Sequence, residues 1–383
     1  MNNQSVSKVV IDLQETIRRA DFKGYDPFDG LNSKLFNLSP FKKSRFFRLA
    51  WLQFHKRSPI NFRPLCLIPK KRNPKAIALM LLGYLNLHKA TQEAQYLQQA
   101  KDLADWLLAN QCQGWQGACW GYPFPWQARA FYVPYGKPNL IATAYVARAL
   151  RQLGNYSKQS HYIEAANQAA DFTFKHLLIT EGNKVYFAYI PGETALIHNA
   201  NLWAAVVIAA AAKQINNQAQ LSTVLAAVDY TLKAQRRDGS WLYGDKPYHQ
   251  FVDSFHSGYN LEALAELQII LGDQRFQSAI DLGLSFYLQH CFEVTGVPKY
   301  YTNNTYPIDA HSAAQAILTL QKLGKTQATK NLKTKIIDYS LSYLYNPKKG
   351  LFYYQLMPYY KNKINYLRWV QAWMFYALSS VDE

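Results

Sequence analysis

The sequence predicts an all-α protein, an (α/α)6 toroid in which six helical hairpins close into a ring. Helices that are apolar on every side alternate along the chain with helices that carry one charged face. The apolar helices begin near residues 75, 139, 199, 258, 311 and 366, a repeat of 53 to 64 residues. Because an all-apolar helix must be surrounded by protein while an amphipathic helix faces water, we expect an inner and an outer ring.

The expected inner helices cover residues 76–87, 140–153, 202–212, 261–271, 313–323 and 367–378. The expected outer helices cover residues 93–108, 161–178, 221–235, 275–290 and 326–344, and a helix at 5–19 or 40–56 supplies the sixth. We expect residues 1–72, which hold N-terminal helices and a basic segment, to pack on a toroid of residues 73–383 within a single domain.

Connections from outer to inner helices are long and aromatic, at 112–138, 179–197, 236–255, 292–308 and 346–366, whereas the opposite connections are short. The long loops therefore meet at the end of the ring where the inner helices begin. Long loops in compact domains are usually functional. Helix N-termini also favour an anionic ligand. We place the candidate site at this end.

Three expected inner helices begin beside a histidine: His198, His256 and His311. Asp253 and Asp309 stand three and two residues before the last two histidines. Histidine titrates near neutrality and exchanges protons, and a nearby carboxylate serves as acid, base or orienting partner. These five are the candidate catalytic residues. The alternative is that the aspartates cap the helices and the histidines are structural. A three-histidine metal site is disfavoured because neighbouring inner helices lie about 8 to 10 Å apart, and we expect neither metal nor cofactor.

Aromatic faces stack on sugar rings, while amide and guanidinium groups hydrogen-bond to hydroxyls, so this end of the ring suits a glycan. The candidate substrate-binding residues are Trp126, Arg129, Asn199, Asn201, Tyr259, Asn260, Tyr306, Gln315, Arg368 and Trp369. The alternative is that the aromatic side chains only pack the loops against one another.

The formal net charge is +17, and the positive excess lies mainly in one segment. Between Asp29 and Glu93 there are thirteen Lys and Arg residues and no acidic residue. Such a segment attracts polyanions. Residues 41–55 interleave aromatic and basic side chains, which is typical of an interfacial helix or a nucleic-acid surface. The alternative is a helix with its aromatic residues in the core. We expect an acidic or lipid-linked oligosaccharide or polysaccharide as partner and peripheral contact with an anionic membrane through residues 34–72, and we do not expect nucleic acid.

The four cysteines show neither a C-x-x-C pair nor a zinc-ligand spacing, so we expect free thiols, with a bridge between Cys112 and Cys119 as the alternative. Residues 1–25 lack the features of a signal peptide, and no apolar run has the length of a spanning helix. The expected location is cytoplasmic, with peripheral attachment to the inner membrane as a further option.

Six short segments, at residues 25–33, 121–127, 197–201, 255–260, 306–311 and 367–373, together resemble a bacterial family of toroid proteins associated with surface-polysaccharide biosynthesis. That family is related in fold to six-hairpin glycosidases, and the wider superfamily holds hydrolases, lyases and epimerases. No carboxylate pair matches the unsaturated-uronyl hydrolase pattern, which argues against simple hydrolysis. Residues 235–241 fit the Q-x-x-x-G-x-W motif of terpene cyclases, where it links outer helices. The acidic D-x-D-D word is missing, so we do not expect cyclase activity.

The expected function is therefore an enzyme of surface-polysaccharide biosynthesis or modification that acts on an acidic or lipid-linked glycan by acid/base chemistry, as a hydrolase, lyase or epimerase. His256 and His311 would exchange the protons. The alternative is a non-catalytic glycan-binding or scaffold component of a membrane-associated synthesis complex.

Overall fold

Six buried helices form the centre of the structure, a computed structural model that describes residues 3–128 and 131–381. They are α4 (Pro74–Thr91), α6 (Leu140–Ser157), α8 (His198–Gln214), α10 (Ser254–Leu271), α12 (Ala310–Leu323) and α14 (Ala372–Ser379), and a π-helical turn at Leu367–Gln371 leads into α14. Their side chains are apolar or small around most of the circumference, so the helices are buried on nearly every side.

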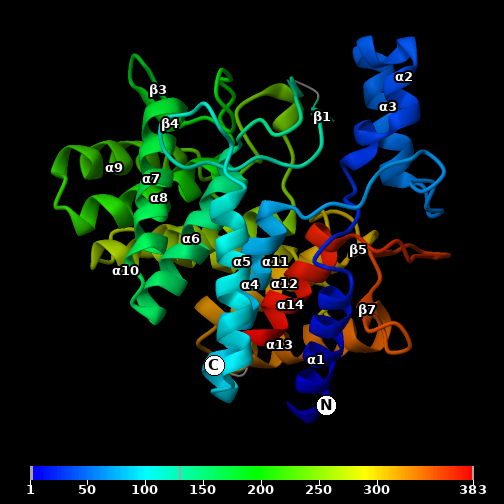
Figure 1. The fold of residues 1–383 in the computed structure, drawn as a ribbon. Helices are drawn as coiled ribbons and strands as arrows, with labels where there is room; N and C mark the ends of the chain where they lie inside the picture. The colour runs from blue at the N-terminus through cyan, green and yellow to red at the C-terminus, as the bar shows by residue number, and fades with distance from the viewer. Residues whose placement is uncertain (1–2, 129–130, 382–383) are drawn as a thin grey trace.

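A second set of helices surrounds the first (Figure 1). It comprises α5 (Ala94–Ala109), α7 (Ser160–Leu177), α9 (Gln218–Leu232), α11 (Gln277–His290), α13 (Gln327–Tyr339) and α1 (Asn3–Arg19). A π-helical turn at Ser340–Leu344 extends α13. Each outer helix buries only one stripe; in α1 this stripe is Val6, Val9, Val10, Leu13 and Ile17. The sequence left open which N-terminal helix completes the outer ring, and α1 does so by packing on α14.

The inner helices form a closed ring. Each contacts the next in chain order, and α14 contacts α4. Glycines allow the closest approaches, since a Cβ atom on Gly83 would lie 2.6 Å from Phe375 of α14, and one on Gly258 would lie 2.8 Å from Gln315 of α12. The predicted (α/α)6 toroid is therefore confirmed.

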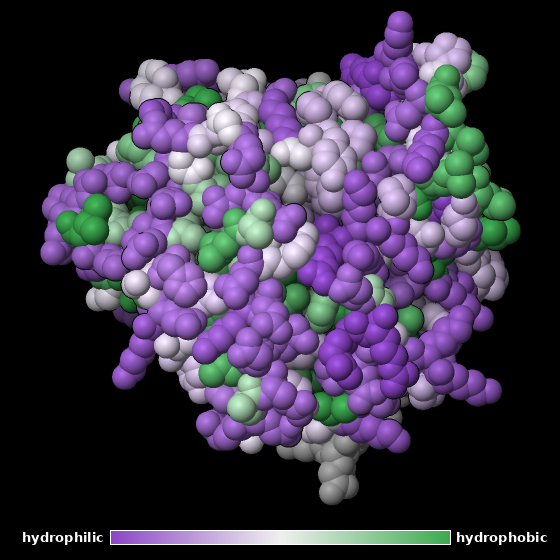
Figure 2. Space-filling view, in the orientation of Figure 1, coloured by the Kyte–Doolittle hydropathy of each residue, from purple (hydrophilic) through white to green (hydrophobic). Residues whose placement is uncertain are grey.

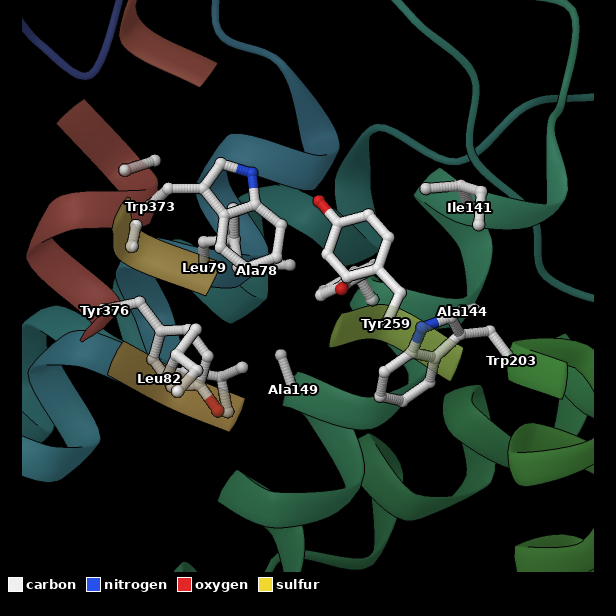
Figure 3. Packing of buried hydrophobic residues seen from close by; sticks show 14 of the residues in the cluster. Ala78, Leu79, Leu82, Ile141, Ala144, Ala149, Trp203, Tyr259, Trp373 and Tyr376 are labelled. Carbon is white, nitrogen blue, oxygen red and sulfur yellow. The ribbon is translucent and has the colours of Figure 1, made fainter. Parts of the chain in front are cut away.

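Aromatic rings fill the middle of the ring. Figure 3 shows Trp203, Tyr259 and Trp373, from three different inner helices, gathered around the axis. The Tyr145 ring links them, with centroid distances of 5.3 Å to Trp203 and 5.4 Å to Trp373. Beyond them, Arg148 lies 3.0 Å from both Glu262 and Glu266, and Lys322 lies 2.7 Å from Glu266. These layers close the centre, so the ring has a packed core.

Short antiparallel strands lie within the long loops. They are β1 (Trp126–Gln127) with β2 (Tyr132–Val133), β3 (Leu178–Glu181) with β4 (Lys184–Phe187), β6 (Tyr345–Asn346) with β7 (Leu351–Phe352), and β5 (Ile308–Asp309) with β8 (Gln355–Leu356) and β9 (Lys361–Asn362). The Gln235 amide donates to the Ala279 carbonyl at 3.0 Å, so the 235–241 motif links α9 to α11. Cys112 and Cys119 are free thiols.

Residues between α1 and α4 reach away from the ring at its loop end (Figure 1). After a 3-10 turn at Asp29–Asn32 come α2 (Lys34–Leu38), a second 3-10 turn at Pro40–Lys43, and α3 (Arg45–Arg57). The expected helix at 40–56 thus begins only at Arg45, because Ser44 is extended. Another 3-10 turn, Pro247–His249, lies in the loop before α10. Among the described residues, no helix is long and apolar enough to cross a bilayer.

Candidate functional site

A cavity of about 190 Å³ lies where the six inner helices begin. The second residue of each inner helix lines it: Lys75, Ile141, Asn199, Phe255, His311 and Arg368, the last in the turn that leads into α14. Phe28, Tyr122, Phe124, Trp126, Tyr189, Tyr243, His256, Tyr259 and Trp369 complete the wall. None of these lining residues is Asp or Glu. The helical repeat thus directs equivalent positions into one aromatic, basic cavity.

His256 and Asp253 form a pair at the start of α10. One carboxylate oxygen of Asp253 lies 2.6 Å from His256 Nδ1, and the other accepts from the His256 backbone N–H at 2.8 Å. Because an ionised carboxylate only accepts, Nδ1 carries the proton and Nε2 is the nitrogen left for a substrate. Asp253 therefore caps the helix and orients the imidazole at once.

Tyr259 and His311 form a second pair, one turn further down α10 and across to α12. The Tyr259 hydroxyl hydrogen-bonds to His311 Nε2. Burial lowers the pKa of His311 well below its usual value, with Lys75 and Arg368 acting in the same direction, and burial raises the pKa of Tyr259 well above 10. A neutral imidazole therefore accepts the hydrogen bond from the phenol, so His311 orients the Tyr259 hydroxyl in the cavity wall.

Lys75 brings an amine to the same cavity. Its Nζ atom lies 4.4 Å from the ring centroid of Tyr145, 4.9 Å from that of Trp373 and 5.3 Å from that of Tyr259. Within the described part of the chain, no carboxylate lies within ion-pair distance of it. The aromatic faces favour the ammonium form, but burial acts against it and lowers the pKa of Lys75 well below 10.5.

Arg368 is the second cation in the cavity, and Asp26 of the 25–33 loop holds it. Its Nε and Nη2 atoms lie 2.5 and 2.8 Å from the two carboxylate oxygens, and both side chains are buried. The guanidinium also lies over the Tyr122 ring, 4.8 Å from its centroid. Asp26 fixes the orientation of Arg368 and neutralises its charge, whereas Lys75 has no ion-pair partner among the described residues.

Three of the candidate catalytic residues, Asp253, Asp309 and His198, do not line the cavity. Asp309 caps α12 through the His311 backbone N–H at 2.8 Å, and its other oxygen accepts from Gln355 at 2.6 Å. Burial raises the pKa of Asp309 to about 6. His198 turns toward α9, where Nδ1 lies 3.2 Å from the Thr231 hydroxyl, and burial lowers its pKa to about 4. His256, Asp253 and His311 are the three that the fold brings together.

The candidate binding residues divide in the same way. Trp126, Asn199, Tyr259, Arg368 and Trp369 line the cavity, and no described residue hydrogen-bonds to the Asn199 side-chain oxygen. Four others lie elsewhere: Asn201 bonds to Ala227 and Thr231, Gln315 bonds to Glu262, Asn260 is buried in α10, and Tyr306 is exposed on a loop. Arg129 lies outside the described residues.

Sequence reasoning missed Lys75, Asp26 and several aromatic wall residues. A signal for Lys75 was present, since it stands at the start of an apolar helix in the place that Asn199 and His311 hold in theirs. Within the described ranges, no group of three His, Cys, Asp or Glu side chains is arranged to hold a metal ion.

A second space of about 410 Å³, the vestibule, adjoins the cavity. Trp126, Tyr189 and Tyr243 line both spaces. Further out, the vestibule wall includes Gln53, Lys56 and Arg57 of α3, together with Phe251 and Tyr301 from loops. A chain longer than one sugar unit therefore has an aromatic and basic path to the cavity.

Comparison of the sequence with protein-family models and with curated proteins finds no match. Solved structures do resemble the fold. An unsaturated glucuronyl hydrolase specific for heparin has a TM-score of 0.64 at 12% identity, covering 99% of this chain and 96% of that one. A polysaccharide lyase has a TM-score of 0.62 at 12% identity, covering 99% and 97%. Cellobiose 2-epimerase from Bacillus thermoamylovorans has a TM-score of 0.59 at 12% identity, covering 80% and 87%.

These neighbours are six-hairpin, glycosidase-like (α/α)6 proteins, so the predicted relation in fold is confirmed. Hydrolase, lyase and epimerase names all occur among them. At this identity the likeness shows the fold alone, and the reaction must be inferred from the cavity itself.

Proposed function

We propose that this protein is a carbohydrate-active enzyme that moves a proton at a sugar carbon next to a carboxylate, in an elimination or an epimerisation of an acidic glycan. One observation carries the proposal: His256, which Asp253 orients, lines the same cavity as the Tyr259–His311 pair and as Lys75, which has no ion-pair partner among the described residues. The fold is one that supports such chemistry in its neighbours.

The wall of the cavity argues against hydrolysis by paired carboxylates. Glycosidases of that type place two Asp or Glu side chains on either side of the glycosidic bond. Here no lining residue is acidic. The nearest candidates, Asp253 and Asp309, are buried and committed to helix caps and side-chain hydrogen bonds.

The cations suit a substrate that carries a carboxylate. Removing the proton from the carbon beside a carboxylate drives negative charge onto the carboxylate oxygens, and a positive group held there stabilises that charge. Lys75 is available for this role because nothing in the described chain pairs with it. A bound carboxylate would in turn favour the ammonium form of Lys75 and offset the effect of burial.

The two remaining pairs supply the proton transfers. Elimination needs a base at the carbon and an acid at the leaving oxygen, and epimerisation needs a base on one face of the carbon and an acid on the other. His256 Nε2 accepts or donates a proton while Asp253 holds the ring. Tyr259 gives its proton to the substrate, and neutral His311 behind it orients the hydroxyl.

The aromatic vestibule, with Lys56 and Arg57 on its wall, suits an acidic chain better than a free monosaccharide. We therefore place the substrate in an acidic or lipid-linked polysaccharide, made or modified at the cytoplasmic side of the membrane. The resemblance to toroid proteins of surface-polysaccharide biosynthesis supports this setting.

The test is proton exchange. Uronate-containing oligosaccharides are incubated with the protein in heavy water, and mass spectrometry follows deuterium incorporation while ultraviolet absorbance follows unsaturated products. His256→Ala should abolish both signals with little change in melting temperature. His198→Asn is the matched control, because His198 also begins an inner helix but lies outside the cavity, and it should retain activity.

Full turnover by His256→Ala would overturn the proposed role of the cavity. Binding of the oligosaccharides without exchange or product, and with the same affinity in wild type and His256→Ala, would instead support the non-catalytic alternative, a glycan-binding or scaffold component of a synthesis complex.

A further inference from the structure

The projection formed by α2, α3 and the loop that follows them exposes large apolar side chains. Leu38 is 84% exposed, and Phe46 and Leu65 are each 72% exposed. Leu35, Phe41, Phe47, Phe54, Ile60 and Leu67 are also exposed. In Figure 2, apolar surface follows the outer edge of this projection. We call these nine side chains the apolar rim.

Part of the rim surrounds a groove. Leu35, Phe41, Phe47 and Phe54 line a groove of about 410 Å³ together with Phe36, Ser39, Ala50 and Trp51. The aromatic rings form two groups: centroids lie 4.5 Å apart for Phe41 and Phe47 and 5.4 Å for Phe46 and Phe47, while Phe54 and Phe62 lie 5.3 Å apart. Contiguous apolar surface of this kind marks a contact with another molecule rather than scattered exposure.

The helix itself is built the opposite way from the outer helices of the ring. Of its thirteen residues, α3 buries Leu52 and His55, while Phe46, Phe47 and Phe54 face solvent. An aromatic face left outside the core needs a different apolar environment. The sequence allowed, as an alternative, a helix whose aromatic residues lie in the core. Phe46, Phe47 and Phe54 do not lie there.

The charge around the rim identifies the partner. Lys34, Lys42 and Lys43 are exposed beside it, and no acidic residue occurs between Asp29 and Glu93. A second copy of the chain would bring its own charge of +17 and the same basic segment, so self-association is opposed. An anionic phospholipid surface offers both an apolar interior for the rings and phosphates for the lysines.

A neighbouring face of α3 borders the vestibule. Gln53, Lys56 and Arg57 line the vestibule, while Phe47, Ala50 and Phe54 line the groove. One helix therefore has a side toward the cavity and a side toward the outside. If the outer side rests on a membrane, the vestibule opens next to the headgroups.

We propose that the apolar rim docks onto an anionic phospholipid bilayer, with its aromatic rings at the boundary between headgroups and acyl chains and Lys34, Lys42 and Lys43 on the phosphates. The docking does not require the enzymatic activity proposed above. It holds the mouth of the cavity at the membrane surface, within reach of a glycan on a lipid carrier.

The test uses the whole chain and sedimentation with two kinds of vesicle: equal parts phosphatidylglycerol and phosphatidylcholine, or phosphatidylcholine alone. We expect binding to the first kind and little to the second. Lys42→Ala with Lys43→Ala should weaken binding roughly thirtyfold, about fivefold for each base near the surface. Phe46→Ser should weaken it about tenfold, as expected for one buried aromatic side chain.

Matched controls carry the same changes elsewhere. Ile269 is 73% exposed at the end of α10, so Ile269→Ser mirrors Phe46→Ser. Lys325→Ala with Lys330→Ala removes two exposed lysines around the start of α13. Both controls should bind as wild type does. Equal binding by the rim variants and their controls would overturn the proposal. So would equal binding to both kinds of vesicle, or Phe46-dependent dimers in sedimentation velocity without lipid.

Discussion

Replacing Lys75 by methionine tests the cavity directly, because it removes the amine and keeps the length of the side chain. The amine has no ion-pair partner within the described chain, so the substitution breaks no internal salt bridge. It loses only the contacts with the Tyr145, Tyr259 and Trp373 rings. In return it removes the cost of burying an amine. We therefore expect the melting temperature to stay the same or to rise.

Ligand binding should change in the opposite direction. A carboxylate about 4 Å from an ammonium group gains roughly 4 kcal/mol at an effective dielectric constant of about 20. Desolvation offsets part of this, and hydrogen bonds to charged groups contribute about 1.5 to 3 kcal/mol net. Lys75→Met should thus weaken binding of a uronate oligosaccharide by about one to two orders of magnitude. The same oligosaccharide with its carboxyl groups reduced to alcohols should bind both proteins alike.

Isothermal titration calorimetry with both ligands measures the difference, and Lys322→Met serves as control. Lys322 also lies on an inner helix, but its amine pairs with Glu266 at the far end of the core, 2.7 Å away. Lys322→Met should lower the melting temperature and leave ligand binding unchanged. The reasoning fails if Lys75→Met binds the acidic ligand like wild type, or if it is destabilised as much as Lys322→Met.

Two further predictions concern stability. Burial lowers the pKa of His198 to about 4, against 6.5 in the unfolded chain, so between these values the unfolded state binds more protons and stability falls as the pH falls. In urea unfolding, the wild type should lose on the order of 3 kcal/mol of unfolding free energy as the pH falls across that window, and His198→Asn should not. An equally steep pH dependence in both proteins would contradict the burial of His198. A Cβ atom on Gly258 would lie 2.8 Å from Gln315 and from Thr319, so Gly258→Ala should cost about 1 to 3 kcal/mol in the same assay. An unchanged urea midpoint would contradict the close contact between α10 and α12 at Gly258.

The toroid could be predicted from sequence because all-apolar and one-sided helical segments alternate along the chain at a regular spacing. The starts of those helices were expected near residues 199, 258 and 311, and α8, α10 and α12 begin one to four residues earlier, at His198, Ser254 and Ala310. The apolar runs themselves begin only at residues 202, 261 and 313. The first turns of the helices hold polar residues, some of which face the cavity, so hydrophobic periodicity does not extend to them.

The two Asp–His pairs look alike in sequence and differ in space. Asp253 stands three residues before His256, and its carboxylate reaches both the backbone N–H and the ring. Asp309 stands two residues before His311, caps the helix, and bonds to Gln355 instead of the ring. Both interpretations offered by the sequence, cap and partner, thus describe Asp253, whereas Asp309 caps its helix and leaves the His311 ring to Tyr259.

Lys75 and Asp26 were missed for different reasons. Lys75 ends a run of bases, which hid the signal of its place at the start of an apolar helix, and the packing of α4 inside the ring buries it. Asp26 and Arg368 are 342 positions apart, and nothing in either local pattern indicates that they meet. Which acid meets which base is a result of ring closure.

Ring closure also determines when, during synthesis, the cavity can be complete. The first helix of the outer ring packs on the last helix of the inner ring, and Asp26 holds Arg368 across the join. During synthesis, α1 and Asp26 are made long before α14 and Arg368, the groups that they contact. The cavity wall is then completed in one late step, because Arg368 and Trp369 arrive with the same turn. A chain shortened by this one helix would keep five hairpins, yet it would lack both the counterpart of Asp26 and one side of the cavity.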